Sequence, residues 1–215
     1  MEAAFRGAPS TASGSLAALA QPFLDAVSQP TAAHGGGSVA ALAGALGASL
    51  GQMVAGFPHK NNSNASPGEP LREAVAEFEA ASHFLTKAID RDAASFESLM
   101  AANKLPHAPP GGQQRRDEVI QQALKSAAQI LLEVARKAAE VFERLGQLEA
   151  LSSPSMLAGI GLGRVMAAAA VQGALENLTI TLESITDADS AAKMKSEARL
   201  LRSRIAKQPV GAEKS

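Results

Sequence analysis

Three glycines and a serine stand directly before a long apolar run: Gly35, Gly36, Gly37 and Ser38. Glycine lets the backbone come close to a ligand. Serine is a frequent first residue of a helix, where free N–H groups and the helix dipole attract negative charge. This segment predicts a site in which backbone donors bind a carbonyl or a carboxylate. A simple turn before a core helix is the alternative, and the glycines alone do not decide between the two.

A carboxylate stands within an apolar helical pattern further along the chain. Asp92 shares a helix face with Ile89 and Phe96. Asp90 points elsewhere, because two residues turn a helix by about 200°. A carboxylate on a core face is costly unless it is paired, hydrogen-bonded or hydrated. Asp92 is therefore either a structural partner or a catalytic acid or base, and the pattern leaves both open.

The remaining polar residues point less clearly to chemistry. Arg164 is isolated among apolar and glycine residues, and we expect its side chain to reach solvent or a carboxylate. The chain has no cysteine, which excludes disulfides, zinc-thiolate sites and thiol nucleophiles. The four histidines, which show no metal-ligand spacing, are His34, His59, His83 and His107. No metal site is expected.

The whole chain is predicted to form helices and essentially no strands. Alanine favours helix, and long helices joined by short loops become antiparallel neighbours. We therefore predict an all-α fold, an antiparallel bundle of about six helices. The expected helices cover roughly residues 16–28, 38–56, 71–103, 114–145, 152–185 and 188–206. They form one domain over residues 15–207, between disordered tails at 1–14 and 208–215.

The helix expected at 38–56 carries two stripes. One stripe has large apolar residues, including Val39, Leu46 and Met53, and the other has small residues, including Gly44 and Gly47. Such a helix has more face to bury than a bundle of this size easily covers. We expect a homodimer formed either by this helix or by the alanine-rich segment 167–174. The helix is long enough to cross a membrane, but it is only weakly hydrophobic and no Lys or Arg cluster flanks it.

The composition indicates which kinds of partner to expect and where in the cell the protein is located. The formal net charge is −1, and 3% of the residues are aromatic, with no Trp or Tyr. These values argue against a nucleic-acid partner or a membrane-surface partner. The N-terminal residues lack the apolar segment of a signal peptide. A cytoplasmic protein is therefore expected.

Several short motifs together resemble one known family, the cyclodeaminase/cyclohydrolase family of folate enzymes. This family includes the cyclodeaminase domain of formiminotransferase-cyclodeaminase and stand-alone methenyltetrahydrofolate cyclohydrolases. The motifs are individually weak, but their order and spacing make the set specific. They are Gly-Gly-Gly-Ser-Val-Ala-Ala at 35–41, Met-Val-Ala at 53–55, Asp-Arg-Asp-Ala-Ala-Ser-Phe at 90–96, Lys-Leu-Pro at 104–106 and Gly-Ala-Leu-Glu-Asn-Leu at 173–178.

The resemblance implies an all-helical homodimer that acts on a tetrahydrofolate derivative. The cyclodeaminase converts 5-formiminotetrahydrofolate to 5,10-methenyltetrahydrofolate and ammonia. The cyclohydrolase converts 5,10-methenyltetrahydrofolate to 10-formyltetrahydrofolate. Either reaction needs a group that moves a proton, and neither requires a metal or a redox cofactor.

The same resemblance suggests roles for individual residues. Asp92 would move the proton. Gly35, Gly36, Gly37 and Ser38 would supply backbone donors to the substrate. Lys60 and Lys104 would meet its anionic glutamate tail, and Asn177 would bond the pterin or hold the site together.

The cyclodeaminase reaction is the first expectation, because the motifs most resemble that domain. The cyclohydrolase reaction is the alternative. A non-catalytic helical module that binds folate or a partner is a third possibility. Two departures from the family pattern favour this third possibility. Ser152, Ser153 and Pro154 stand where the family has a Ser-Asp pair, and the loop at 56–62 lacks the family's Thr and Lys-rich run. His34 also stands in place of a proline, and Thr181 in place of a second asparagine.

Overall fold

The computed structural model describes residues 15–30, 35–57, 68–105 and 112–207, and this part of the chain contains helices and no strand. The all-α prediction is therefore confirmed. The helices are α1 (Leu16–Ser28), α2 (Gly36–Gly56), α3 (Glu69–Asn103), α4 (Gly112–Leu148), α5 (Leu157–Glu183) and α6 (Ala188–Ala206). The start expected for α5 near residue 152 is wrong, because two tight 3-10 turns, η2 (Glu149–Leu151) and η3 (Pro154–Met156), precede it. The two expected tails lie outside the described residues.

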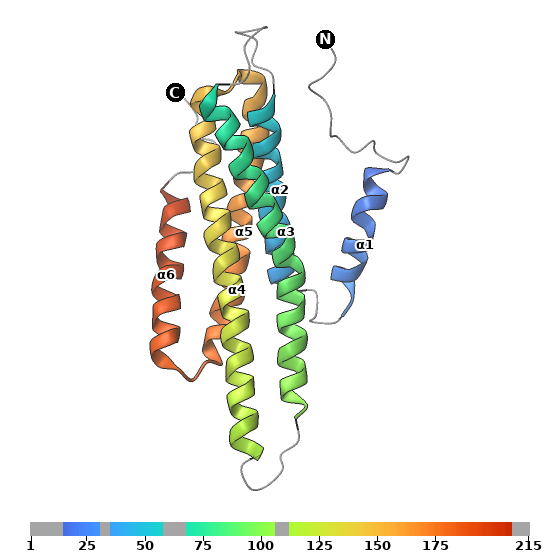
Figure 1. Cartoon of the computed structure of the whole chain (residues 1–215), viewed down its shortest axis with the longest axis vertical. Coiled ribbons are helices and arrows are strands. Elements are labelled where there is room, and N and C mark those ends of the chain that lie inside the picture. The colour runs from blue at the N-terminus through green and yellow to red at the C-terminus, as the bar shows by residue number, and fades with distance from the viewer. Residues whose placement is uncertain (1–14, 31–34, 58–67, 106–111, 208–215) are drawn as a thin grey trace.

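Helices α2 to α5 form the bundle, and consecutive helices run antiparallel (Figure 1). Helix α2 packs along both α3 and α5, and α4 closes the bundle on the other side. Helix α6 lies against α4 and α5. Helix α1 stands off the bundle (Figure 1) and buries none of its residues. The core that positions a site is thus the four-helix bundle.

The small-residue stripe of α2 faces the inside of this bundle. A Cβ atom on Gly47 would lie 2.8 Å from the carbonyl oxygen of Gly163 on α5. A Cβ atom on Gly51 would lie 2.6 Å from the ring of Phe78 on α3. Contacts this short are closed to any side chain. Glycine is therefore required where α2 approaches its neighbours, and α2 lies unusually deep between them.

The large-residue stripe of α2 faces outward. Val39, Leu46 and Met53 are 40%, 46% and 51% exposed. On the neighbouring helix α5, Leu162 and Val165 are also about half exposed. An apolar surface of this kind marks an interaction site in most soluble proteins.

Two segments are long and apolar enough to cross a membrane by length and composition. They are Gly36–Gly56 and Pro154–Glu183, and 50% and 33% of their most apolar windows are buried inside the protein. Core helices of soluble proteins pass the same test. The exposed residues of these two segments include those of the outward apolar surface, such as Leu46 and Val165.

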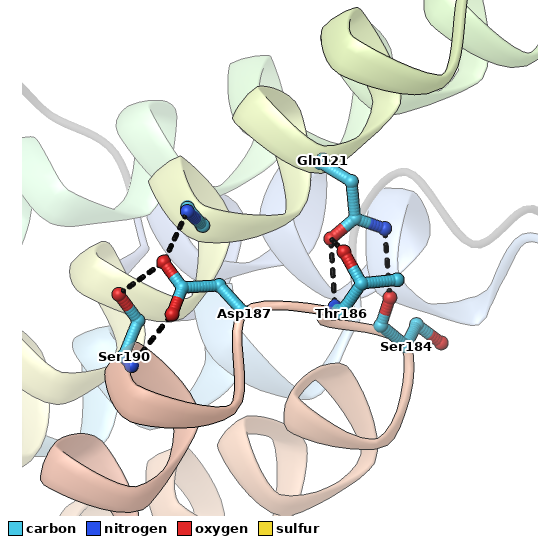
Figure 2. A network of polar contacts seen from close by, with 6 residues as sticks. Gln121, Ser184, Thr186, Asp187 and Ser190 are labelled. Atoms are coloured by element: carbon cyan, nitrogen blue, oxygen red, sulfur yellow. Dashed lines mark hydrogen bonds and ion pairs between the residues drawn. The ribbon is translucent and has the colours of Figure 1, made fainter. Parts of the chain in front are cut away.

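A polar network holds the start of α6 against α4 (Figure 2). The Asp187 carboxylate accepts a hydrogen bond from the backbone N–H of Ser190 at 3.0 Å and forms an ion pair with Lys125 Nζ at 2.7 Å. These donors hold the pKa of Asp187 well below its usual value. Beside it, the Gln121 side chain bonds the backbone of Ser184 and Thr186. Side-chain capping and an ion pair thus add to the apolar contacts that Ala198 and Leu201 of α6 make with the core.

The two glycines Gly47 and Gly161 offer a matched test of the packing. Gly47→Ala should lower the free energy of unfolding by about 1–3 kcal/mol, because the methyl group meets the Gly163 backbone, which cannot move away. Gly161→Ala on α5 has nothing within 4 Å of the new Cβ. It should be neutral or stabilise by up to about 1 kcal/mol, because alanine favours helix. Urea unfolding of both variants measures the difference, and equal stabilities would contradict the packing described here.

Candidate functional site

Three helices meet at the N-terminal end of α2. A Cβ atom on Gly37 would lie 2.2 Å from Oδ1 of Asp92 on α3. A Cβ atom on Gly36 would lie 2.4 Å from Nδ2 of Asn177 on α5. These two glycines therefore allow a carboxylate and an amide to come against the backbone of the first helical turn. The structure brings together four of the groups predicted from sequence: the glycine backbone, Ser38, Asp92 and Asn177.

Asp92 caps α2 from a different helix. Its Oδ2 accepts a hydrogen bond from the Ser38 hydroxyl at 2.9 Å, and the backbone N–H of Ser38 also donates to this carboxylate. The first-turn N–H groups of a helix lack partners within the helix. The residue in the usual capping position, Gly35, makes no side-chain cap bond. Asp92 thus supplies the acceptor that the α2 sequence lacks.

Burial changes the acid strength of Asp92. Removal from water raises the pKa of its carboxyl above the usual value, and the two hydrogen bonds from Ser38 oppose this rise without cancelling it. Asp90 is exposed, as its helical position predicted. A half-buried carboxyl with a raised pKa holds its proton more tightly than an exposed one, which suits a group that both takes and releases a proton during a reaction. The arrangement is therefore capable of general acid–base chemistry.

Ser38 is buried beside Asp92, and its contact with a substrate stays a prediction. The sequence predicted that Ser38 binds the substrate through its backbone donor. In the structure the Ser38 side chain is 1% exposed, and both its hydroxyl and its N–H serve Asp92. The backbone N–H groups of Gly36 and Gly37 belong to the first turn of α2, where N–H groups have no partner within the helix. The missing signal was the pairing of a serine in α2 with an aspartate 54 residues away, which no local spacing reveals.

Asn177 is fixed beside the glycines. Its Nδ2 donates to the carbonyl oxygen of Gly173 at 2.8 Å, one turn earlier in α5. This bond holds the amide group in one orientation against Gly36. Asn177 therefore provides a positioned polar group on the side of the site opposite Asp92.

One predicted residue, Lys104, is not brought to this cluster. Lys104 forms the C-terminal cap of α3 and is exposed. It lies 12 residues after Asp92 on that helix, about 18 Å away along the axis. Lys60 lies outside the described residues, as does His34. Contact of either lysine with a ligand stays a prediction.

Arg164 has a structural environment. Its side chain is 7% exposed, its Nη1 lies 3.2 Å from Glu149, and its guanidinium stacks on the Phe142 ring at 4.5 Å. The expectation that Arg164 reaches a carboxylate is confirmed. The charge is thus accommodated within the fold, away from the Asp92 cluster.

A groove of about 600 Å³ lies elsewhere, between α3 and α4. It is lined partly by Phe84, and its two cations are already paired: Lys137 with Glu140 and Arg144 with Glu77. Within the described ranges, no group of three or more acidic, histidine or cysteine side chains could hold a metal ion. The Asp92 cluster remains the better candidate site.

The raised pKa of Asp92 predicts a particular dependence of stability on pH. A carboxyl that binds its proton more tightly in the folded state stabilises the fold below its unfolded pKa, and this contribution is lost as pH rises through the folded pKa. The amide introduced by Asp92→Asn would keep an acceptor for Ser38 but would not titrate. Asp92→Asn should therefore gain stability relative to wild type as pH rises from about 4 to 8.

Chemical unfolding across this pH range measures the effect. Asp90→Asn removes one exposed carboxylate from the same helix and serves as the control. A stability difference between Asp92→Asn and wild type that stays constant with pH would show that burial does not perturb Asp92.

Comparison with known proteins identifies the family. The sequence profile of formiminotransferase-cyclodeaminase matches residues 8–200. The formimidoyltransferase-cyclodeaminase of Gallus gallus is 34% identical over 165 residues, which cover 77% of this chain and 30% of the chicken protein. The Rattus norvegicus protein of the same name is 32% identical over the same length. This chain thus spans less than a third of these relatives.

Two further proteins match over most of their own length. A methenyltetrahydrofolate cyclohydrolase from Methylorubrum extorquens is 26% identical over 78% of this chain and 80% of its own. The crystal structure of formiminotetrahydrofolate cyclodeaminase from Thermotoga maritima superimposes with a TM-score of 0.77, covers 91% of both chains and is 24% identical. At that identity the likeness shows a shared fold. Together with the profile match, these findings show that the chain belongs to the formiminotransferase-cyclodeaminase family.

Proposed function

We propose that this protein is a folate enzyme that converts 5-formiminotetrahydrofolate to 5,10-methenyltetrahydrofolate and ammonia. The observation that carries the proposal is the half-buried Asp92 carboxyl at the N-terminus of α2, with its raised pKa. The family membership and the chicken and rat relatives, named for a cyclodeaminase, support the same chemistry.

The reaction requires one proton to be moved between two nitrogens. The folate N10 attacks the formimino carbon, and the new C–N10 bond produces a tetrahedral carbon. The former imino nitrogen then departs as ammonia, once it carries the additional proton. In this proposal Asp92 accepts the proton from N10 and returns it to the departing nitrogen, so that its own charge is restored at the end of the cycle.

The neighbouring groups would orient the substrate. The N–H groups of Gly36 and Gly37, in the first turn of α2, would donate to a carbonyl or carboxylate of the folate. Gly35 precedes them as the first residue of the turn. The Asn177 amide would bond the pterin on the other side. Lys104 and Lys60 would attract the glutamate tail of the folate.

The cyclohydrolase reaction is the second candidate, favoured by the Methylorubrum relative, which matches over 80% of its length. Here Asp92 would take a proton from water as that water attacks the methenyl carbon. That proton then passes to the nitrogen that leaves the carbon when the ring opens, and the remaining hydroxyl proton is released to solvent as the formyl C=O bond forms. A folate-binding module without catalysis is the third candidate, and the activity test below separates all three.

We further propose a soluble, cytoplasmic homodimer. Val39, Leu46 and Met53 on α2 form an outward apolar stripe beside Leu162 and Val165 on α5. A second copy of the chain, related by a two-fold axis, would cover this surface with its own matching stripe. The surface begins at Val39, directly after Ser38, so a partner subunit would lie next to the site.

Light scattering tests the dimer. The wild-type protein should have the mass of two chains at micromolar concentration. Leu46→Glu places a charge in the apolar stripe and should shift the mass toward one chain. Leu200→Glu, at an exposed leucine of α6 away from the stripe, should leave the dimer intact. A wild-type protein that is monomeric at this concentration would contradict the proposal.

The catalytic role of Asp92 is tested by paired substitutions. Asp92→Asn keeps the shape but removes the proton acceptor, so turnover should fall by about 10²–10⁴-fold with little effect on substrate binding. Asp90→Asn should retain nearly full activity, because that side chain is exposed.

The absorbance of methenyltetrahydrofolate identifies the reaction. Its appearance from 5-formiminotetrahydrofolate supports the cyclodeaminase. Its loss faster than in buffer alone supports the cyclohydrolase. If neither occurs while calorimetry still detects bound folate, the protein is a binding module, and the enzyme proposal is wrong.

A further inference from the structure

The Ser38 hydroxyl lies between two acceptors. Its Oγ is 2.9 Å from Oδ2 of Asp92 and 3.2 Å from the backbone carbonyl oxygen of Ile89, both on α3. A serine hydroxyl has one hydrogen to donate and two lone pairs to accept with. It can therefore donate to either acceptor but not fully to both. The side chain is 1% exposed, so water does not compete for these positions.

We propose that Ser38 is a positioning residue that rotates its hydroxyl hydrogen between Asp92 and Ile89 as Asp92 loses and gains its proton. When Asp92 is ionised, the hydroxyl donates to the carboxylate. When Asp92 is protonated, the carboxyl O–H donates to Ser38 Oγ, and the hydroxyl turns to donate to the Ile89 carbonyl. No proton is lost or gained by Ser38 in either state.

The need for such a residue follows from burial. A half-buried carboxyl that titrates must find hydrogen-bond partners in both of its states, because an unsatisfied polar group in the interior costs free energy in whichever state lacks one. A lysine would serve only the ionised state, because its ammonium group donates and cannot accept. A hydroxyl serves both, because it both donates and accepts.

The surrounding charges do not offer an alternative. Described residues 35–57 of α2 contain no charged side chain. On α5 the neighbouring polar group is the neutral Asn177. On α3 the adjacent Asp90 is exposed, and Arg91 pairs with Glu133 of α4 at 2.8 Å. Within the described part of the chain, Ser38 is thus the group whose hydrogen bonds change when Asp92 gains or loses its proton.

This inference rests on the proposed function for its purpose but not for its test. The carboxyl carbon of Asp92 can be followed by NMR as pH changes in protein labelled with ¹³C-aspartate, with Asp92→Asn to assign the signal. Ser38→Ala removes the hydroxyl. The ionised form then loses a charge-assisted bond and the protonated form loses a weaker neutral one. The proton affinity of Asp92 should rise about fivefold.

Two variants control the measurement. Ser38→Thr keeps the hydroxyl and should titrate like the wild type. Ser95→Ala removes a second buried serine, whose hydroxyl donates to the backbone oxygen of Asp92 and not to its carboxylate, and should also leave the titration in place. If Ser38→Ala fails to keep its helical circular dichroism, Ser38→Cys, with a weaker donor of similar size, should move the titration in the same direction.

An Asp92 titration that is unchanged in both Ser38→Ala and Ser38→Cys would overturn the proposal. The rate profile separates this outcome from failure of the proposed function. If the titration moves and the acid limb of kcat/KM moves with it, Ser38 acts on the reacting group. If the titration moves while the protein turns over no folate, the Ser38 proposal stands and the folate reaction does not.

Discussion

The close approach of α2 to its neighbours is the constraint on which the structure depends. Gly47 lies so near the Gly163 backbone, and Gly51 so near the Phe78 ring, that side chains cannot be accommodated. The same approach continues to the end of the helix, where Gly36 and Gly37 meet Asn177 and Asp92. The close packing of α2 and the geometry of the candidate site therefore have the same cause. The helix that fills the core also places its N-terminal donors against a carboxylate and an amide from two other helices.

Asp92 has a structural task and, in the proposed function, a chemical one. It caps α2 and joins that helix to α3, and its burial favours the protonated form. A carboxylate chosen only for capping would be more useful on the surface, where ionisation is not penalised. The fold instead holds a carboxyl whose pKa burial raises, and such perturbed groups are frequent at functional sites. The two hydrogen bonds from Ser38 oppose this rise in the pKa of Asp92.

Much of this arrangement was accessible from sequence. Apolar spacing and proline positions predicted α1 and α6 to within the observed bounds, and the start of α2 to within two residues. Asp92 stood out because a carboxylate interrupted an apolar face. The serine–aspartate pair was not accessible, because the rotation of α2 against α3 is set by packing between residues 54 positions apart. The exposure of Val39 and Met53 was equally hidden, since a helix apolar on every side does not reveal which side turns inward.

The two faces of α2 tolerate substitution to different degrees. On the inner face, an atom added at Gly47 or Gly51 would force a neighbouring helix to shift. On the outer face, Val39, Leu46 and Met53 have side chains that reach away from the bundle. Substitutions along the outer stripe can therefore change the surface that α2 presents while the inner contacts, including those of Asp92, keep their geometry.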